Sequence, residues 1–359
     1  MVDMEIFLFG VFTKSHQSLQ KKPLCFIYIF MIVVKHEECF CEESPASTVV
    51  GTGSSPSFIL AHLSDPHFFS PTGSRLSDFL NKRLYGYLSW RWRRRHEHSD
   101  KVVAALIKDL KCQHPDHITV TGDLTHLGLP DEYRRAAEFL RLLGPPERVT
   151  AIPGNHDAYV ASAWENGQNL WKSYLVGDSV HSPGEKPKIS FPFIRQRGDV
   201  VFIGLSTAHP CLPLLATGTL GKVQLQHLEA LLNEYGSRQQ CRVILIHHPP
   251  VPGVISWRKR LTDYRDFCDL LQRQGAELVL HGHAHIASCS FLETPAGRIP
   301  VVGVPSASAI GRTPDRRSEY NLYHIARNDQ GWQVKFKRRR YSVSSNNFFD
   351  RGSWQSLLP

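Results

Sequence analysis

Five short polar stretches of the chain carry side chains that could bind a metal ion. Asp65 and His67 stand two residues apart, and Asp123 follows Gly122. The remaining candidates are Asn155, His247, His283 and His285. Any one stretch has an ordinary structural explanation, such as the turn that Asp65-Pro66 favours. Seven donors in five stretches indicate a shared site if the fold brings them together.

The mixture of donors predicts the kind of metal. Imidazole nitrogen combined with carboxylate oxygen suits Mn, Fe, Zn or Co, whereas Mg and Ca prefer oxygen alone. A single carboxylate with two available oxygens can bridge two ions about 3.5–4 Å apart. Because no cysteine belongs to the set, a closed structural zinc site is disfavoured. The set of donor side chains therefore favours a site for two divalent or trivalent ions.

The elements that must position these donors are predicted strands alternating with helices. Each polar stretch follows a short apolar run, and amphipathic helices are expected over 100–111, 131–143, 222–234 and 261–273. The runs before the polar stretches are 58–64, 117–121, 148–152, 242–246 and 277–280, with a further strand over 200–205. After residue 299 the pattern changes to strands alone, over 299–304, 321–326 and 332–337. In an open α/β sheet, ligands bind at the carboxyl ends of the strands, so five such ends predict one edge rich in ligands.

In this order the motifs resemble those of the calcineurin-like metallophosphoesterase superfamily. They are Asp65-x-His67, Gly122-Asp123, Gly154-Asn155-His156-Asp157, His247-x-Pro249 and Gly282-His283-x-His285, spread over about 58–304. The resemblance implies an α/β fold, a four-layer α/β-β/α sandwich with two packed mixed sheets. It also implies two metals, one held by Asp65, His67, Asp123 and His285, and the other by Asp123, Asn155, His247 and His283.

The same resemblance implies roles for residues that do not bind metal. His156 is expected to protonate the leaving oxygen or stabilise the transition state, and Asp157 to support its loop. The alternative for His156 is support of the metal ligands alone. At position 126, where family members often carry Asp or Asn, this chain has His126. A neutral imidazole there is a possible orienter of His156, although it cannot fix an imidazolium as a carboxylate does.

The expected activity is hydrolysis of a P–O bond by a hydroxide that bridges the two metals. The His-His-Pro-Pro and Gly-His-Ala-His forms are most similar to the bacterial cyclic-nucleotide phosphodiesterase branch, so a cyclic nucleotide or another phosphodiester is the expected substrate. A phosphomonoesterase or a nuclease with the same site remains an alternative, as does a metal-binding scaffold without turnover. The stretch Gly303–Ser308 is expected either to line the pocket or to form a plain turn.

Composition adds broad limits. The formal charge of +9 and the pI near 9.2 favour anionic partners. No apolar run reaches the ~18–20 residues of a membrane helix. The eight cysteines show no disulfide framework, which favours a reducing, cytoplasmic setting, with a location at the membrane periphery as the alternative.

The chain ends differ from the predicted phosphoesterase domain, which is expected over 57–340. Residues 1–56 contain Lys21-Lys22, a twelve-residue apolar run at 23–34 and a cysteine-rich acidic patch. A signal peptide or anchor is one interpretation, and a disordered or mis-started leader is the favoured one. Residues 341–359 are predicted to be a C-terminal tail, preceded by a basic run at 335–340 that is expected to end a surface strand.

The segment Asn81–Arg95 is the second informative stretch. It interleaves six basic residues with four large aromatic ones. Such a segment could contact an anionic membrane surface or nucleic acid, and it could form a lid near the metals. The alternative is a helix whose aromatic side chains pack on the domain.

Overall fold

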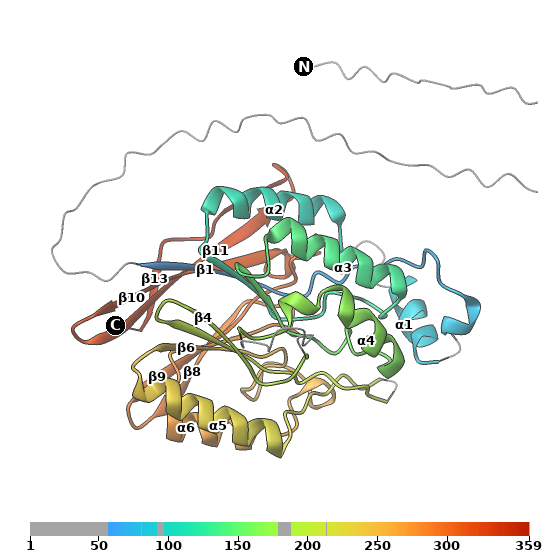
Figure 1. Cartoon of the computed structure of the whole chain (residues 1–359). Helices are drawn as coiled ribbons and strands as arrows, with labels where there is room; N and C mark the ends of the chain where they lie inside the picture. Colours follow the sequence, from blue (N-terminus) through green and yellow to red (C-terminus); the bar gives the residue numbers. More distant parts are fainter. Residues whose placement is uncertain (1–56, 80, 92–96, 179–187, 213, 359) are drawn as a thin grey trace, which may run out of the picture. The chain divides into compact units, whose positions relative to one another are not determined.

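The computed structural model describes residues 57–358, except 80, 92–96, 179–187 and 213 (Figure 1). The predicted N-terminal extension, 1–56, lies outside the described residues. The description below concerns the compact unit that begins at Thr48. Among the described residues, none of the helices combines the length and the apolar composition needed to cross a lipid bilayer.

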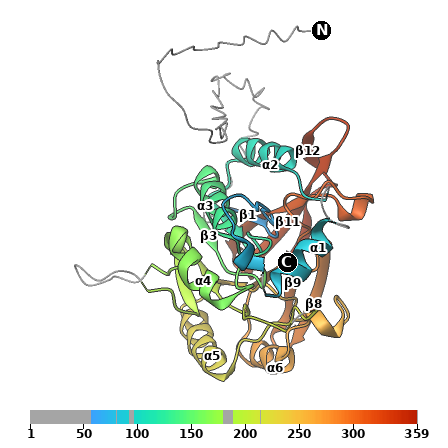
Figure 2. The same ribbon diagram turned by 90° about the vertical axis from the view of Figure 1, so that its right-hand side faces the viewer.

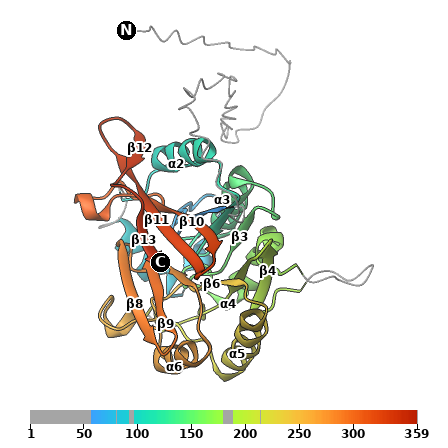
Figure 3. The same cartoon turned by 90° about the vertical axis from the view of Figure 1, so that its left-hand side faces the viewer.

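The first sheet is mixed. Its parallel part consists of β1 (Phe58–Leu63), β2 (His117–Val120) and β3 (Val149–Ala151). The last strands of the chain complete it, since β10 (Glu319–Asn328) pairs antiparallel with β1. Beyond β10 lie β11 (Gly331–Ser342), β12 (Asn347–Asp350) and β13 (Gln355–Leu358), as Figure 3 shows.

The second sheet has a parallel centre and two antiparallel edges. The parallel strands are β5 (Val200–Gly204), β6 (Cys241–Leu245), β7 (Leu278–His281) and β9 (Gly297–Gly303). The edges are β4 (Phe193–Arg197) and β8 (Ser288–Thr294), which each pair antiparallel with one neighbour. Almost every residue of β5, β6 and β7 is buried, as expected of strands covered on both faces.

Helices cover the outer face of each sheet, so the layers run helix, sheet, sheet, helix (Figure 2). The first sheet is covered by α2 (Asp100–Gln113) and α3 (Pro130–Leu143), whose apolar sides pack with Leu63 and Val120. The second is covered by α5 (Lys222–Ser237) and α6 (Tyr264–Gln274). Between the sheets, Leu60, Phe202, Val243 and Tyr323 share one core. The four-layer α/β expectation is confirmed.

Where local prediction differs from the structure, tertiary contacts decide. The helix expected from residue 261 begins at Tyr264, because Leu261 is buried and forms a bridge with Gly218. The edge strands β4 and β8 lack a continuous apolar run and are not predicted. Residues 341–359, expected as a tail, contribute strands β12 and β13.

The basic run at 335–340 is not a strand end. It lies inside β11, where Arg340 pairs with the buried Glu319 and Arg339 pairs with Asp109 of α2. Arg340 therefore links two strands of the sheet, and Arg339 links the sheet to α2.

Candidate metal centre

The carboxyl ends of β1, β2, β3, β6 and β7 bring the predicted donors together at one edge of the two sheets. Among the described residues, three groups of side chains offer ligand atoms that lie within 4.8 Å of one another. One of them is His67, His126 and His156, and the other two consist of predicted donors alone. Of these two, the first is Asp65, His67 and His285, and the second is Asp123, His247 and His283. Each of these two groups therefore combines residues from both sheets.

In the first group, two imidazoles face one carboxylate. Nε2 of His285 lies 3.2 Å from Oδ1 of Asp65, and Nε2 of His67 lies 3.6 Å from the same oxygen. The two Nε2 atoms are 2.9 Å apart. Oδ1 of Asp65 is buried and has no hydrogen-bond donor among the described residues. A buried carboxylate oxygen facing two imidazole nitrogens fits a metal ion better than a protein donor.

In the second group, Nε2 of His247 lies 3.3 Å from Oδ2 of Asp123 and 3.2 Å from Oδ1 of Asn155. The amide oxygen of Asn155 therefore joins the carboxylate and the imidazole. His247 and Asp123 are almost fully buried, and Asn155 is nearly so. The set offers nitrogen and oxygen donors together, which suits the same range of metals.

Asp123 lies between the two groups. Its Oδ2 is 3.7 Å from Nε2 of His67 and 3.3 Å from Nε2 of His247. Its Oδ1 accepts a hydrogen bond of 2.7 Å from the backbone N–H of His156. One oxygen thus holds the neighbouring loop, and the other faces an imidazole from each group.

Backbone carbonyls fix how the imidazoles present their nitrogens. The carbonyl of Thr121 lies 2.6 Å from Nδ1 of His247, and that of Thr125 lies 3.3 Å from Nδ1 of His67. These contacts leave Nε2 to face the site. For His283 the carbonyl of Lys259 lies 3.0 Å from Nε2, which leaves Nδ1.

The loops that carry the donors adopt an unusual backbone. Asp65, His67, Asp123, His283 and His285 all have φ between 47° and 66°. They are five of the nine non-glycine residues with positive φ in the described chain. This left-handed conformation costs roughly 1–2 kcal/mol per residue. Such strain accumulates where the surrounding structure must aim functional side chains.

Two glycines permit the close approach of these loops. A Cβ at Gly154 would collide with the backbone and carboxylate of Asp123, and one at Gly282 would collide with Ser64 and Asp65. Since neither glycine needs a positive φ, the requirement is for space alone. Gly154 therefore lets the Asp123 carboxylate lie against the loop after β3, and Gly282 lets the Asp65 carboxylate lie against the loop after β7.

The electrostatics favour ionised carboxylates. Burial opposes ionisation of Asp65, but the imidazoles of His285 and His67 hold its pKa well below the ordinary value. Burial would lower the pKa of His247, yet the Asp123 carboxylate raises it to about 9. Burial and the neighbouring histidines His248 and His247 hold the pKa of His283 well below the ordinary value. These donors suit a bound cation. A metal ion at His247 would take the place of the proton that the raised pKa of this side chain otherwise favours.

The sequence that carries these donors matches a known protein family. The family model described as calcineurin-like phosphoesterase matches residues 58–287, which include every donor named above. The chain belongs to the calcineurin-like phosphoesterase family.

Relatives of this phosphoesterase include two bacterial proteins. The glycerophosphodiester phosphodiesterase GpdQ of Enterobacter lignolyticus is 27% identical over 54% of this chain and 58% of its own length. A probable cyclic nucleotide phosphodiesterase of Synechococcus sp. is 30% identical over 52% of this chain and 64% of its own length. The chain thus spans about three fifths of the length of these curated relatives.

A solved structure supports the fold independently. The dimetal phosphatase of Danio rerio has a TM-score of 0.53 and 13% identity, covering 84% of this chain and 99% of that one. At this identity the likeness concerns the fold alone.

The remaining residues singled out in the sequence lie beside the metal groups. Nδ1 of His156 lies 2.6 Å from the main-chain carbonyl oxygen of His126, and the two rings stack with centroids 5.3 Å apart. Asp157 is fully buried, and its carboxylate accepts from the N–H groups of Gly154 and Thr125. Burial, reinforced by the Asp123 carboxylate, raises the pKa of Asp157.

The stretch Gly303–Ser308 lies beneath the loop of Asp65. The hydroxyl of Ser306 donates to the carbonyl of Asp65, and that of Ser308 donates to the carbonyl of Pro66, both at 2.7 Å. Residues 307 and 308 form a turn, as one of the two expectations had it, and none of the stretch is among the residues that line the cleft. Its hydroxyls support the strained loop of Asp65.

A cleft of about 300 Å³ opens above the donors of this phosphoesterase. Its lining includes Asp123, Asn155, His156, His283 and His285. Lys82, just before α1 (Arg83–Ser89), also lines the cleft and belongs to the segment for which a lid was one interpretation. Sequence reasoning missed other lining residues, among them Tyr159, His209 and Cys211, because the loops that carry them approach the cleft only in the folded chain. His98 was missed as well, and its ring lies 5.1 Å from that of His67.

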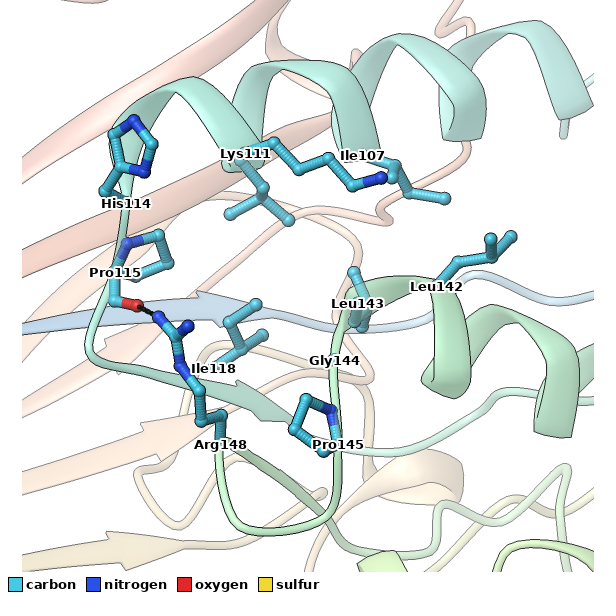
Figure 4. Close-up of a pocket in the computed structure, with 11 residues that line it drawn as sticks. Ile107, Lys111, His114, Pro115, Ile118, Leu142, Leu143, Gly144, Pro145 and Arg148 are labelled. Carbon is cyan, nitrogen blue, oxygen red and sulfur yellow. Dashed lines mark hydrogen bonds between the residues drawn. The ribbon is translucent and has the colours of Figure 1, made fainter. Parts of the chain in front are cut away.

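A second hollow, of about 270 Å³, lies at the opposite end of the first sheet (Figure 4). It is bounded by the ends of α2 and α3 and by Ile118 near the start of β2. Arg148 crosses it and donates to the carbonyl of Pro115 at 2.6 Å. It contains none of the metal-binding candidates.

The described part of Asn81–Arg95 packs on the domain. Trp90 stacks on Phe69 with centroids 3.8 Å apart, and Tyr87 contacts Phe79. Arg83 is buried and donates to the carbonyls of Leu127 and Gly128. Residues 92–96 lie outside the described part. These contacts favour the packed-helix interpretation for Arg83, Tyr87 and Trp90, while Lys82 and Tyr85 line the cleft.

Proposed function

We propose that the chain is a metal-dependent phosphodiesterase whose centre holds two ions. The observation that carries this proposal is the position of Asp123, whose Oδ2 faces one imidazole of each group at 3.7 and 3.3 Å. A carboxylate oxygen placed between two donor sets is the arrangement that a bridging ligand requires.

One ion would be held by Asp65, His67, Asp123 and His285. The other would be held by Asp123, Asn155, His247 and His283. Mn, Fe, Zn or Co would suit these donors. When bound, such ions lower the pKa of water and neutralise charge on phosphoryl oxygens.

His156 would act on the leaving group. Since its Nδ1 is engaged by the carbonyl of His126, its Nε2 would be the nitrogen that acts in the cleft that it lines. A proton delivered from Nε2 to the departing oxygen would remove the need to expel an alkoxide. Asp157 would support this step indirectly, because it accepts from Gly154 in the loop of His156 and from Thr125 beside His126.

The preference for a diester rests on two observations. Both bacterial relatives described above are named as phosphodiesterases. In addition, the lining of the cleft extends from the metal donors to Lys82, Tyr85 and Leu214, which could accommodate a second group on the phosphorus. A monoester would leave that extension empty.

Turnover of matched substrates by the metal-loaded protein tests the proposal. Bis-p-nitrophenyl phosphate, p-nitrophenyl phosphate, a cyclic nucleotide and a glycerophosphodiester would be compared after reconstitution with Mn²⁺. We expect kcat/KM to be higher for a diester than for the monoester. Asp123→Asn should lose metal and at least about 10³-fold in kcat/KM. The control Asp329→Asn changes an exposed carboxylate in the β10–β11 turn and should behave like the parent protein.

Two results would overturn the proposal. Exclusive hydrolysis of the monoester would reject the diesterase assignment. Full activity and full metal content in Asp123→Asn would reject the bridging role of Asp123.

A further inference from the structure

The mouth of the cleft carries an apolar rim that the proposed chemistry does not use. Four large side chains there are largely exposed: Tyr85 (63%), Leu212 (74%), Leu214 (83%) and Trp257 (64%). They are four of the twelve exposed large hydrophobic residues in the described chain. Clustered exposure of this kind marks an interaction surface, whereas single exposed residues are ordinary.

Hydrogen bonds and shared cleft walls bring the segments of the rim together. Tyr85 and Leu214 line the same cleft. Lys82, just before α1, donates from Nζ to the carbonyl of Cys211 at 3.2 Å. On the other side, the N–H of Ala216 donates to the carbonyl of Arg258 at 2.9 Å, so the loop of Leu214 runs beside the segment of Trp257.

Basic side chains lie next to the apolar ones in the chain. Arg258, Lys259 and Arg260 are all exposed and follow Trp257 directly. Lys82, Lys259 and Arg316 line the cleft, where Glu97 and the metal-site Asp123 are the carboxylates among the described lining residues. The rim is therefore both apolar and cationic.

An apolar hollow continues the rim on its outer side. It measures about 180 Å³ and is bounded by Val251, Pro252, Ile255 and Trp257, with Arg260 at its edge. A protein partner could also cover an apolar rim. The cations beside an apolar hollow match an anionic headgroup above an acyl chain more closely.

We propose that this rim docks the phosphoesterase on an anionic lipid bilayer, so that the cleft takes the phosphodiester headgroup of a bilayer lipid. The docking stands on the rim itself, and the choice of substrate rests on the proposed phosphodiesterase function. Tyr85, Leu212, Leu214 and Trp257 enter the interface, and Arg258 and Arg260 contact headgroup phosphates. The open cleft then faces the lipid headgroups.

Vesicle sedimentation tests the docking without reference to activity. The full chain would be mixed with phosphatidylcholine vesicles that contain or lack phosphatidylglycerol. We expect binding to the anionic vesicles, weakened by salt. Arg258→Gln/Arg260→Gln should weaken it about 25-fold, since each cation near an anionic surface contributes a factor of about five. Leu212→Ser/Trp257→Ser should weaken it about tenfold or more.

Matched double variants elsewhere provide controls. Val343→Ser/Phe349→Ser removes exposed apolar side chains near β12, and Lys101→Gln/Lys108→Gln removes exposed cations on α2. Neither pair should change vesicle binding. Equal sedimentation of the parent protein with both vesicle types, or equal losses in rim and control variants, would overturn the docking and leave a protein partner as the occupant of the rim.

Hydrolysis separates the two proposals. A diacylglycerol p-nitrophenyl phosphodiester in anionic vesicles would be compared with soluble bis-p-nitrophenyl phosphate. Leu212→Ser/Trp257→Ser should reduce kcat/KM for the vesicle substrate about tenfold and leave the soluble diester unchanged. Hydrolysis of the soluble diester with no preference for vesicles would overturn the lipid inference alone. Vesicle binding with neither diester hydrolysed would overturn the proposed function and the substrate choice, but not the docking.

Discussion

The carbonyl oxygen of His126 lies 2.6 Å from Nδ1 of His156. The contact that orients the proposed general acid thus involves the main chain at position 126, although the sequence suggests the side chain. Any residue at 126 supplies that carbonyl. The identity of the side chain should therefore matter less than the resemblance to the family implies.

Replacing His126 tests this reasoning. We expect His126→Ala to lose less than about tenfold in kcat, against the 10²–10⁴-fold typical of losing a general acid or base, which we expect for His156→Gln. Steady-state kinetics on a diester, with metal content measured in parallel, would compare the two. Equal losses in both variants at equal metal content would assign the orienting role to the ring of His126.

The leaving group gives His156 a more specific test. If the residue protonates the departing oxygen, His156→Gln should reduce kcat strongly for a diester with an alkyl leaving group and only slightly for one that releases p-nitrophenolate, which needs no proton. The two kcat values, measured at saturating substrate, check this. A uniform loss for both would indicate that His156 supports the centre without transferring a proton.

Gly154 should be sensitive to a single methyl group. Because its Cβ would collide with the backbone and carboxylate of Asp123, Gly154→Ala should displace the proposed bridging ligand. We expect a loss of about 1–3 kcal/mol in the free energy of unfolding, together with reduced metal content. Gly198→Ala is the control, since no atom lies within 4 Å of a Cβ there, although its φ of 60° carries its own cost. Denaturant titration and elemental analysis would measure both quantities.

Metal removal should destabilise the protein because the centre joins the two sheets. The backbone N–H of His283, after β7, donates to Oδ2 of Asp65, after β1, at 2.9 Å. A free metal-ion concentration of 100 times the dissociation constant would add about 2.7 kcal/mol to the free energy of unfolding. We expect chelation to lower the Tm of the parent protein but hardly that of Asp65→Asn, as followed by calorimetry. A Tm of the parent protein that changes neither with chelator nor with added metal would contradict this expectation.

Acid sensitivity should arise in part from His117, which stacks on Phe202 away from the centre. Burial, and then the nearby Arg197 and Arg195, lower the pKa of His117 to about 2 from the usual 6.5. The folded state therefore resists a proton that the unfolded state accepts below pH 6.5. Stability from this group is complete above that pH and falls by about 1.4 kcal/mol per pH unit below it.

His117→Gln should remove this contribution to the pH dependence of the free energy of unfolding. The free energy of unfolding, measured by denaturant titration between pH 4.5 and 6.5, would fall less steeply than in the parent protein. Parallel lines for the two proteins would show that His117 gains a proton in the folded state as readily as in the unfolded one.

The order of strand and polar turn was accessible from the sequence because it is local. Apolar runs and the Asp, Asn and His residues that end them can be read within a few positions, as at Asp65 and Asp123. The family match agrees with that interpretation. By contrast, β4 and β8 are half-exposed edge strands without continuous apolar runs, so their pairing depends on β5 and β9.

The walls of the cleft were not accessible for a similar reason. Lys82 and Cys211 meet across 129 positions, and nothing in either stretch indicates the other. The left-handed φ values of the loops that carry the proposed ligands were also hidden, since non-glycine residues rarely adopt that conformation, although Asp and His do so more often than most. Strain of this kind arises from the assembled sheets and has no local pattern.

The pairing of β1 with β10 has a consequence for synthesis. Phe58 lies opposite Ile325. One edge of β1 therefore stays uncovered until β10, nearly 270 residues later in the chain, has been synthesised. A nascent chain that has emerged only as far as His285 already holds every proposed metal ligand, yet β1 still exposes unpaired backbone groups. During translation this edge is open to pairing with other chains. A ribosome stalled after His285 would therefore hold a chain whose first sheet has an open, aggregation-prone edge.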